Sequence, residues 1–189
     1  MIEAAPSVTE RPRYRRGTRK VTLKRGPIFR PLVEDDLKYL GAAWKKGALD
    51  SMGGVFAEHD LSAQEFLQRA AEALADLPDG TGKWMLEAPV GGKLTPVGLM
   101  VAAVVEHRME PNVYWFPWAS MRNKLETVVK FINFMRRHYL VIVMHPVAMK
   151  PFFEAVARHG VLTRAGVIPG YYADADAMFW WSPRPKRGN

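Results

Sequence analysis

The sequence predicts a protein of the α/β (α+β) class, with a mixed, mostly antiparallel central sheet of about seven strands flanked by about four helices. Three strand-like runs follow one another between residues 83 and 118 with short turns between them, which favours an antiparallel meander. The apolar spacing changes to a helical period from Ser120 onward. A buried-type strand, a helix and two more strands end the chain, which indicates that helices and strands share one domain.

The N-terminal part of this domain begins with a strand and a helix. Residues Pro27 to Val33 form a short strand-like run, and three acidic residues follow at positions 34 to 36. Acidic side chains are favourable in the first turn of a helix because its N-terminal end is electropositive. We therefore expect a helix that continues through Trp44, followed by a loop rich in small residues at Gly47 to Gly54.

The clearest helix start is at Ser62. Ser62 and Glu65 are three residues apart and form a capping box, in which each side chain bonds the backbone N–H of the other. Apolar residues then recur at helical spacing through Leu77, until residues 78 to 80 (Pro-Asp-Gly) end the pattern. The sequence therefore predicts an amphipathic helix from Ser62 to Leu77.

The three meander strands are expected at Lys83 to Ala88, Val97 to His107 and Asn112 to Trp118. Turn-forming residues cluster at Pro89 to Thr95 and at Arg108 to Pro111. We therefore expect these two segments to be the turns that reverse the chain.

The last third of the chain alternates helix and strand. Ser120 is the expected N-cap of a helix that ends with basic residues at 136 to 138, where cations favour the helix dipole. The remaining expected elements are a strand at Tyr139 to Met144, a helix at Val147 to Arg158 with Gly160 as its C-cap, a strand at Val161 to Val167, a turn at Ile168 to Gly170, and a strand at Ala177 to Trp181. A strand, a short link and a helix suggest a crossover connection.

Charge divides the chain into three parts. The formal net charge is +8, with 27 basic and 19 acidic residues. We expect a basic arm at residues 1–26, a nearly neutral domain at 27–181 and a basic tail at 182–189. Basic arms contact polyanions or acidic protein surfaces, or serve as solubilising tails. The arm residues expected to interact are Arg11, Arg13, Arg15, Arg16, Arg19 and Lys20.

Several classes of function are excluded by composition and spacing. The chain has no cysteine, so it forms no disulfide, thiolate metal site or cysteine nucleophile. Its five histidines show no metal-binding spacing, and we expect no metal. Apolar runs are far shorter than the ~20 residues of a membrane helix, so we expect no membrane partner. There is no helix-turn-helix or zinc-finger pattern for sequence-specific DNA binding.

The order of the elements resembles the GNAT acetyltransferase superfamily over residues 28 to 181. The segment Phe29-Arg30-Pro31 with Glu34-Asp35-Asp36-Leu37 is similar to the opening strand and helix of many members. Pro117, which closes the fourth strand before a long helix, is similar too. So is a strand that ends at His145, with Ala148, Phe152, Phe153 and Glu154 in the next helix and Gly160 after it.

The resemblance implies a cofactor loop at the start of the helix at Ser120. Members bind the pyrophosphate of acetyl-CoA there with backbone N–H groups, in a pattern of Arg or Gln, two residues, Gly, one residue, then Gly or Ala. From Arg122, Leu125 and Thr127 stand where the small residues belong, and we expect their side chains to obstruct the phosphates. The cofactor residues that the resemblance implies are Pro117, Ser120, Arg122, Asn123, Lys124 and Leu125.

The catalytic positions that the resemblance implies are altered as well. Phe152 and Phe153 occupy the place of the tyrosine that protonates the leaving thiolate, and neither can donate a proton. His145 replaces a common asparagine. Tyr171 or Tyr172 is a candidate general acid, and Glu87 or Glu106 is a candidate base that deprotonates an amine.

Two functional hypotheses follow. The favoured one is a GNAT-fold protein with a degenerate acetyl-CoA loop, which binds no cofactor and uses its basic arms and the apolar Phe179, Trp180 and Trp181 to engage a protein assembly. It resembles small GNAT-like proteins of tailed bacteriophages, some of them virion-associated, so we expect it in the bacterial cytoplasm or the virion. The alternative is an acetyl-CoA-dependent N-acetyltransferase. A third possibility, a general nucleic-acid coat protein, rests on the arms alone.

Overall fold

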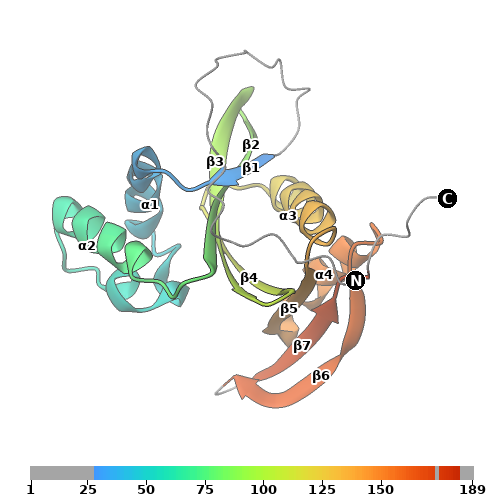
Figure 1. Ribbon diagram of the computed structural model, residues 1–189. Helices are drawn as coiled ribbons and strands as arrows, with labels where there is room; N and C mark the ends of the chain where they lie inside the picture. Colours follow the sequence, from blue (N-terminus) through green and yellow to red (C-terminus); the bar gives the residue numbers. More distant parts are fainter. Residues whose placement is uncertain (1–27, 173–174, 184–189) are drawn as a thin grey trace, which may run out of the picture.

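The computed structural model describes residues 28–172 and 175–183, so most of both basic segments lies outside the described residues. Seven strands form one sheet in the order β1-β2-β3-β4-β5-β7-β6 (Figure 1). The strands are β1 (Ile28–Pro31), β2 (Thr81–Val90), β3 (Lys93–Val105), β4 (Arg108–Trp115), β5 (Leu140–Pro146), β6 (Thr163–Tyr172) and β7 (Ala175–Trp181). The α-helices are α1 (Leu37–Trp44), α2 (Ala63–Ala75), α3 (Met121–Met135) and α4 (Lys150–Ala157). The predicted fold class is confirmed.

The helices lie on both faces of the sheet (Figure 1). Helices α1 and α2 cover one face of the β1–β4 part, and α3 and α4 pack on the opposite face. Side chains along a strand alternate between faces. Met85 accordingly belongs to the core under α1 and α2, and its neighbour Leu86 to the core under α3 and α4. No helix among residues 28–172 and 175–183 is long and apolar enough to span a bilayer.

Both predicted N-caps are confirmed. The Ser62 Oγ accepts a hydrogen bond from Glu65 N (3.2 Å), and the Glu65 carboxylate accepts one from Ser62 N (2.9 Å). At the start of α3, the Ser120 Oγ accepts a hydrogen bond from Asn123 N at 3.1 Å. These side chains satisfy backbone donors that the first turn of a helix leaves unpaired. The sequence therefore fixes where α2 and α3 begin.

The three strands of the meander are longer than predicted because the turns between them are shorter. Gly91 and Gly92 alone connect β2 to β3, both with positive φ (58° and 80°), which a two-residue hairpin turn favours. The predicted turn at Arg108 to Pro111 is wrong: these residues belong to β4. The chain reverses at Glu106 and His107, where Glu106 has a φ of 53°.

β4 and β5 are parallel neighbours joined by the crossover helix α3, and they separate along their length. Their pairing consists of Arg108 with Leu140 and Met109 with Val141, after which the two strands diverge. Pro111 lies within β4, two residues after Met109, and pairs only with β3. Proline has no backbone N–H, so it is tolerated where a strand lacks a partner on one side. The divergence leaves a gap in the middle of the sheet.

The C-terminal hairpin also differs from the prediction. Strand β6 does not end at Val167 but continues through the predicted turn to Tyr172, with an irregular register between Ile168 and Tyr172. Gly170 has a φ of 61°, and its N–H donates to the Asp176 carboxylate at 2.9 Å. This extension brings the end of β6 to the gap between β4 and β5, where Tyr172 lines a cavity.

Candidate functional site

A cavity of about 340 Å³ occupies the gap where β4 and β5 diverge. Its walls come from β4, β5, α3 and the start of α4, together with the end of β6. The lining is mainly apolar, with Met100, Val113, Trp115, Val143 and Phe152 among its residues. Ligand sites are typically apolar hollows of this size with a few polar groups that orient the ligand. The parting of the two strands therefore creates the principal candidate site among the described residues.

The cavity reaches from one face of the sheet to the other. On the α3–α4 side it is lined by Val128 and Ile132 of α3 and by Phe152 of α4. On the opposite side it is lined by Tyr114, which packs against the α1–α2 core, and by Ser51, which belongs to the short η2 helix (Asp50–Met52). A ligand entering from the α3–α4 side can thus meet a second molecule that enters from the α1–α2 side.

His145 forms part of the cavity wall and is held in one protonation state. It is buried, it stacks on Phe153 with ring centroids 4.0 Å apart, and its Nε2 accepts a hydrogen bond from the Trp180 indole at 2.7 Å. The Nδ1 lies 2.8 Å from the Pro146 carbonyl, to which it donates. Burial lowers the pKa of His145, although the bond to Pro146 opposes this shift. Because both nitrogens are engaged, neutral His145 supports the wall and is not free to exchange protons.

Tyr172 is the sequence-predicted acid that the structure places at the cavity. It lines the cavity, whereas Tyr171 does not and is 51% exposed. Burial, followed by the influence of Tyr171, raises the pKa of Tyr172. A phenol with a raised pKa keeps its proton at neutral pH and can donate it. Of the two predicted tyrosines, Tyr172 thus has the position and the protonation state that a general acid needs.

A second hollow adjoins the cavity near the N-terminus of α3. Trp115, Met149 and Phe152 line both, and the second hollow is also lined by Met121 and Lys124 in the first turns of α3. The Lys124 ammonium lies 5.9 Å from the centroid of the Trp115 ring. Lysine and the electropositive end of a helix both favour an anion. The hollow next to the cavity is therefore suited to phosphate groups.

Arg122 and Asn123 lie on the other side of the α3 start. Together with Pro89, Ser120 and Glu126 they line a separate, open hollow. The Arg122 Nε donates to Glu126 at 2.6 Å, and this hydrogen bond raises the pKa of Arg122 further. The side chain of Arg122 is 84% exposed. Of the two predicted phosphate-binding cations, the structure places Lys124 in the hollow next to the cavity and Arg122 away from it.

The expected obstruction by Leu125 and Thr127 is not found. Helix α3 begins at Met121, so both residues lie beyond its first turn. Leu125 packs against the core, and Thr127 is fully buried with its hydroxyl donating to the Asn123 carbonyl at 2.6 Å. Their side chains point into the protein because they belong to the inner stripe of the helix. Pro117 lies before the helix and is exposed, and it lines none of the three hollows at the cavity and at the start of α3.

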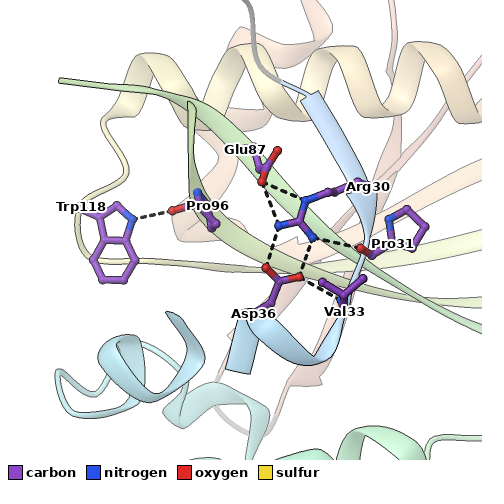
Figure 2. A network of polar contacts seen from close by, with 7 residues as sticks. All are labelled: Arg30, Pro31, Val33, Asp36, Glu87, Pro96 and Trp118. Atoms are coloured by element: carbon purple, nitrogen blue, oxygen red, sulfur yellow. Dashed lines mark hydrogen bonds and ion pairs between the residues drawn. The ribbon is translucent and has the colours of Figure 1, made fainter. Parts of the chain in front are cut away.

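Glu87, a predicted base, is committed to an ion pair (Figure 2). The Arg30 guanidinium donates to Glu87 Oε1 at 3.0 Å and to both oxygens of Asp36 at 2.6 and 2.7 Å. Asp36 also accepts from Val33 N at 3.0 Å. Glu87 lies on β2, two strands away from β4 in the sheet, and does not line the cavity. The structure therefore does not place Glu87 at the cavity as a base; its carboxylate joins β2 to β1 and, through Arg30, to the start of α1.

The same network fixes the charge of its members. The hydrogen bond to Asp36 is the largest influence on Arg30 and raises its pKa well above the usual range. Burial by itself raises the pKa of Asp36, but the hydrogen bonds from Arg30 and Val33 outweigh it and lower that pKa below its ordinary value. Arg30 and Asp36 are therefore both ionised at neutral pH, and the network stabilises the fold.

The structure also places Glu106 and Trp180 differently from their predicted roles. The Glu106 side chain is 80% exposed in the turn between β3 and β4, and it does not line the cavity, so it is not placed to act as a base. Trp180, predicted to lie in a protein interface, is 2% exposed and bonds His145 from within the core. Phe179 is half-buried and Trp181 is 38% exposed, because residues of a strand alternate between faces. The predicted arm residues from Arg11 to Lys20 lie outside the described residues.

Comparison with known proteins agrees with this architecture. No protein-family model matches the chain, and no curated protein matches its sequence. Among solved structures, the chain is similar to a spermidine N-acetyltransferase from Vibrio cholerae in complex with CoA and spermine (TM-score 0.61, 11% identity, 84% of this chain and 95% of that chain). It is also similar to a chimera of the Vibrio cholerae enzyme and hSSAT (TM-score 0.60, 13% identity, 84% and 95%). The chain thus has the GNAT fold, as the sequence resemblance implied, while the bacteriophage likeness stays a prediction.

Sequence reasoning missed the cavity walls on β4 and β5. The gap depends on where these two strands stop pairing, and a single strand's sequence does not show that. Met144, Met149 and Asn112 line the cavity and stand in no recognisable motif. One signal was present. Pro111 directly precedes the strand-like run Asn112 to Trp118, and proline at a strand indicates that one side of the strand has no partner.

Proposed function

We propose that the protein binds an acyl-CoA thioester in the gap between β4 and β5 and transfers the acyl group to a primary amine. The observation that supports this most directly is the cavity, which passes through the sheet and adjoins a cationic hollow at the start of α3. The solved structures of similar fold include a Vibrio cholerae spermidine N-acetyltransferase in complex with CoA and spermine. This proposal replaces the cofactor-free interpretation that the sequence favoured.

The residues fit the parts of such a thioester. The apolar walls formed by Val113, Trp115 and Phe152 suit an uncharged chain with amide groups, and the backbone N–H groups at the start of α3 with Lys124 suit its phosphates. When bound, acyl-CoA supplies an activated carbonyl and a thiolate leaving group. Tyr172 lines the cavity, and its phenol holds the proton that a departing thiolate needs.

Replacement of the tyrosine tests the proposed transfer. We expect Tyr172→Phe to lower the rate of CoA release from acetyl-CoA with an amine acceptor by about 100-fold, because general acid catalysis contributes at least that much. Its affinity for acetyl-CoA, measured by isothermal titration, should stay close to that of the wild type. Tyr171→Phe is the matched control, since Tyr171 is adjacent but does not line the cavity. Equal rates for the two variants would exclude Tyr172 as the acid.

A second candidate function is binding without catalysis. The observation in its favour is that Phe152 and Phe153 in α4 occupy the place where the GNAT resemblance implies an acidic tyrosine. In that case acetyl-CoA or CoA would bind, and no amine would promote release of CoA beyond the rate without protein. The basic segments at residues 1–26 and 182–189 would then be the part to delete in a search for a protein or nucleic-acid partner.

A further inference from the structure

The half of the cavity on the α1–α2 side has uncharged walls. Ser51, Asn112, Tyr114 and Met144 line it, and Tyr172 stands at the same cavity. Tyr114 and Met144 alternate along their strands with residues of the α3–α4 core, so they face the other side of the sheet. Two phenols, an amide, a hydroxyl and a thioether thus form the surface that an acceptor would meet.

Among residues 28–172 and 175–183, the titratable side chains that line the cavity are His145, Tyr114 and Tyr172. His145 has both nitrogens engaged by Trp180 and Pro146. Burial raises the pKa of Tyr114, so this phenol stays neutral as well. A strongly basic ammonium group that entered these walls would lose its hydration without gaining a paired charge, which is costly. An amine that is already neutral, with an apolar body, is the acceptor that these walls fit.

Two carboxylates, Asp50 and Glu110, are close in sequence to residues on this side of the cavity, but neither lines it. Asp50 precedes Ser51, and its Oδ1 lies 3.0 Å from His59 Nε2. Glu110 lies two residues before Asn112 on β4, nearer to the point where β4 pairs with β5, and it does not line the cavity. Neither carboxylate is part of the wall where an acceptor nitrogen would approach the thioester.

Resting on the proposed function, we propose that the acceptor is a weakly basic primary amine next to an apolar side chain, that is, the α-amino group of a peptide that begins with an apolar residue. The amine nitrogen forms a bond to the acyl carbon, and the bond between that carbon and sulfur breaks. The Tyr172 hydroxyl protonates the departing thiolate. The nitrogen loses its surplus proton to solvent, from which the Tyr172 phenolate is protonated again, so the products are an amide and CoA.

A matched pair of small amines tests the inference. L-phenylalaninamide presents an α-amino group, and 2-phenylethylamine presents the same ring on an ordinary alkylamine. An α-amino group has a pKa near 8 and an alkylamine near 10.4, so at pH 7.5 the neutral fraction differs by about 100-fold. We expect kcat/KM, measured as CoA release at pH 7.5, to favour L-phenylalaninamide by about that factor over both 2-phenylethylamine and spermidine.

Two further measurements keep the outcomes apart. Acetyl-CoA affinity is measured in the same preparation by isothermal titration. If acetyl-CoA does not bind, the proposed function itself is wrong. If it binds and spermidine or 2-phenylethylamine reacts as fast as L-phenylalaninamide, only the acceptor inference is overturned. The tripeptide amide Phe-Ala-Ala presents the same α-amino group on a longer chain and should also react, whereas no reaction with it would contradict a peptide acceptor.

Variants of the wall provide an independent test. Asn112→Glu places a carboxylate where an acceptor ammonium would lose its proton, and we expect it to raise the rate with 2-phenylethylamine at pH 7.5 at least about tenfold. Asn112→Gln, of the same length without the charge, should not. Asp174 lies outside the described residues and follows Tyr172 by two positions. Asp174→Asn should leave the rates with both amines unchanged, and a lower rate with 2-phenylethylamine in this variant would contradict the inference by identifying a carboxylate base.

Discussion

The two edges of β4 differ, and the difference separates the stable part of the molecule from the part that can bind a ligand. On one edge, β4 pairs with β3 from Arg108 to Trp115 without interruption. On the other edge, it pairs with β5 at Arg108 and Met109 and then leaves a cavity. Beyond the closed edge, Arg30 of β1 forms ion pairs with Glu87 of β2 and with Asp36 at the start of α1. The cavity at the open edge is lined by neutral side chains, and one of them, Tyr172, can donate a proton.

The largest expected effect is on the closed side. Asp36→Asn should lower the free energy of unfolding by about 2–4 kcal/mol, because it removes one charge from a buried ion pair and leaves Arg30 without its bidentate partner. Urea unfolding followed by circular dichroism measures this loss. Asp35→Asn is the control, since Asp35 is the exposed neighbour in the same turn.

Acid should remove the same contribution from the wild type. The pKa of Asp36 is lowered from 3.8 in the folded state, so its contribution is fully present above that value and is lost as the pH falls through the lower folded pKa. The stability difference between wild type and Asp36→Asn should therefore shrink below about pH 4. A difference that is constant from pH 7 to pH 2 would show that the carboxylate charge is not what stabilises this edge.

A smaller effect is expected at the wall of the open side. His145→Phe keeps a ring against Phe153 but leaves the buried Trp180 N–H without an acceptor, which costs about 1–3 kcal/mol. The double variant with Trp180→Phe should show a coupling of at least about 0.5 kcal/mol between the two positions. Additive losses in urea unfolding would mean that this hydrogen bond contributes nothing.

The pH dependence of this wall has a defined sign. The pKa of His145 is lowered from 6.5 in the fold, so protonation of the unfolded chain destabilises the protein as the pH falls below 6.5. His145→Phe should lose this component, and the gap in stability between the two proteins should narrow from pH 7 to pH 5.

The smallest expected effect distinguishes the two sides of the α3 start. Lys124→Glu should weaken acetyl-CoA binding about tenfold, or about 1.4 kcal/mol, because Lys124 lines the hollow that adjoins the cavity. Arg122→Glu should change the affinity by less than about threefold, since Arg122 lines the separate hollow and is paired with Glu126. Isothermal titration of both variants measures the difference. The opposite ranking would place the phosphates in the hollow of Arg122.

Local signals in the sequence predicted the fold well, and pairing between distant segments explains where they failed. The Ser62 and Ser120 caps are contacts over three residues, so the sequence shows them directly. The Arg30 network joins residues 57 positions apart, and no local pattern distinguishes a structural Glu87 from a catalytic one. Tyr172 was one of two adjacent candidates, and only the irregular path of β6 determines which of them meets the cavity.

The turn predictions failed for a related reason. Pro111 was assigned to a turn because proline disfavours paired strands, but on the open side of β4 no N–H is needed. Glu106, at the turn itself, has a positive φ that is uncommon for a residue other than glycine. Pro111, which led to the wrong turn prediction, is therefore a residue that lines the cavity.

The most direct test of the central claim, that the open edge of β4 is an acyl-CoA site, is isothermal titration of the wild-type protein with acetyl-CoA at low salt. We predict binding in the micromolar range, one molecule per chain, together with a melting temperature that rises with cofactor concentration. No heat of binding and an unchanged melting temperature at millimolar acetyl-CoA would contradict the claim.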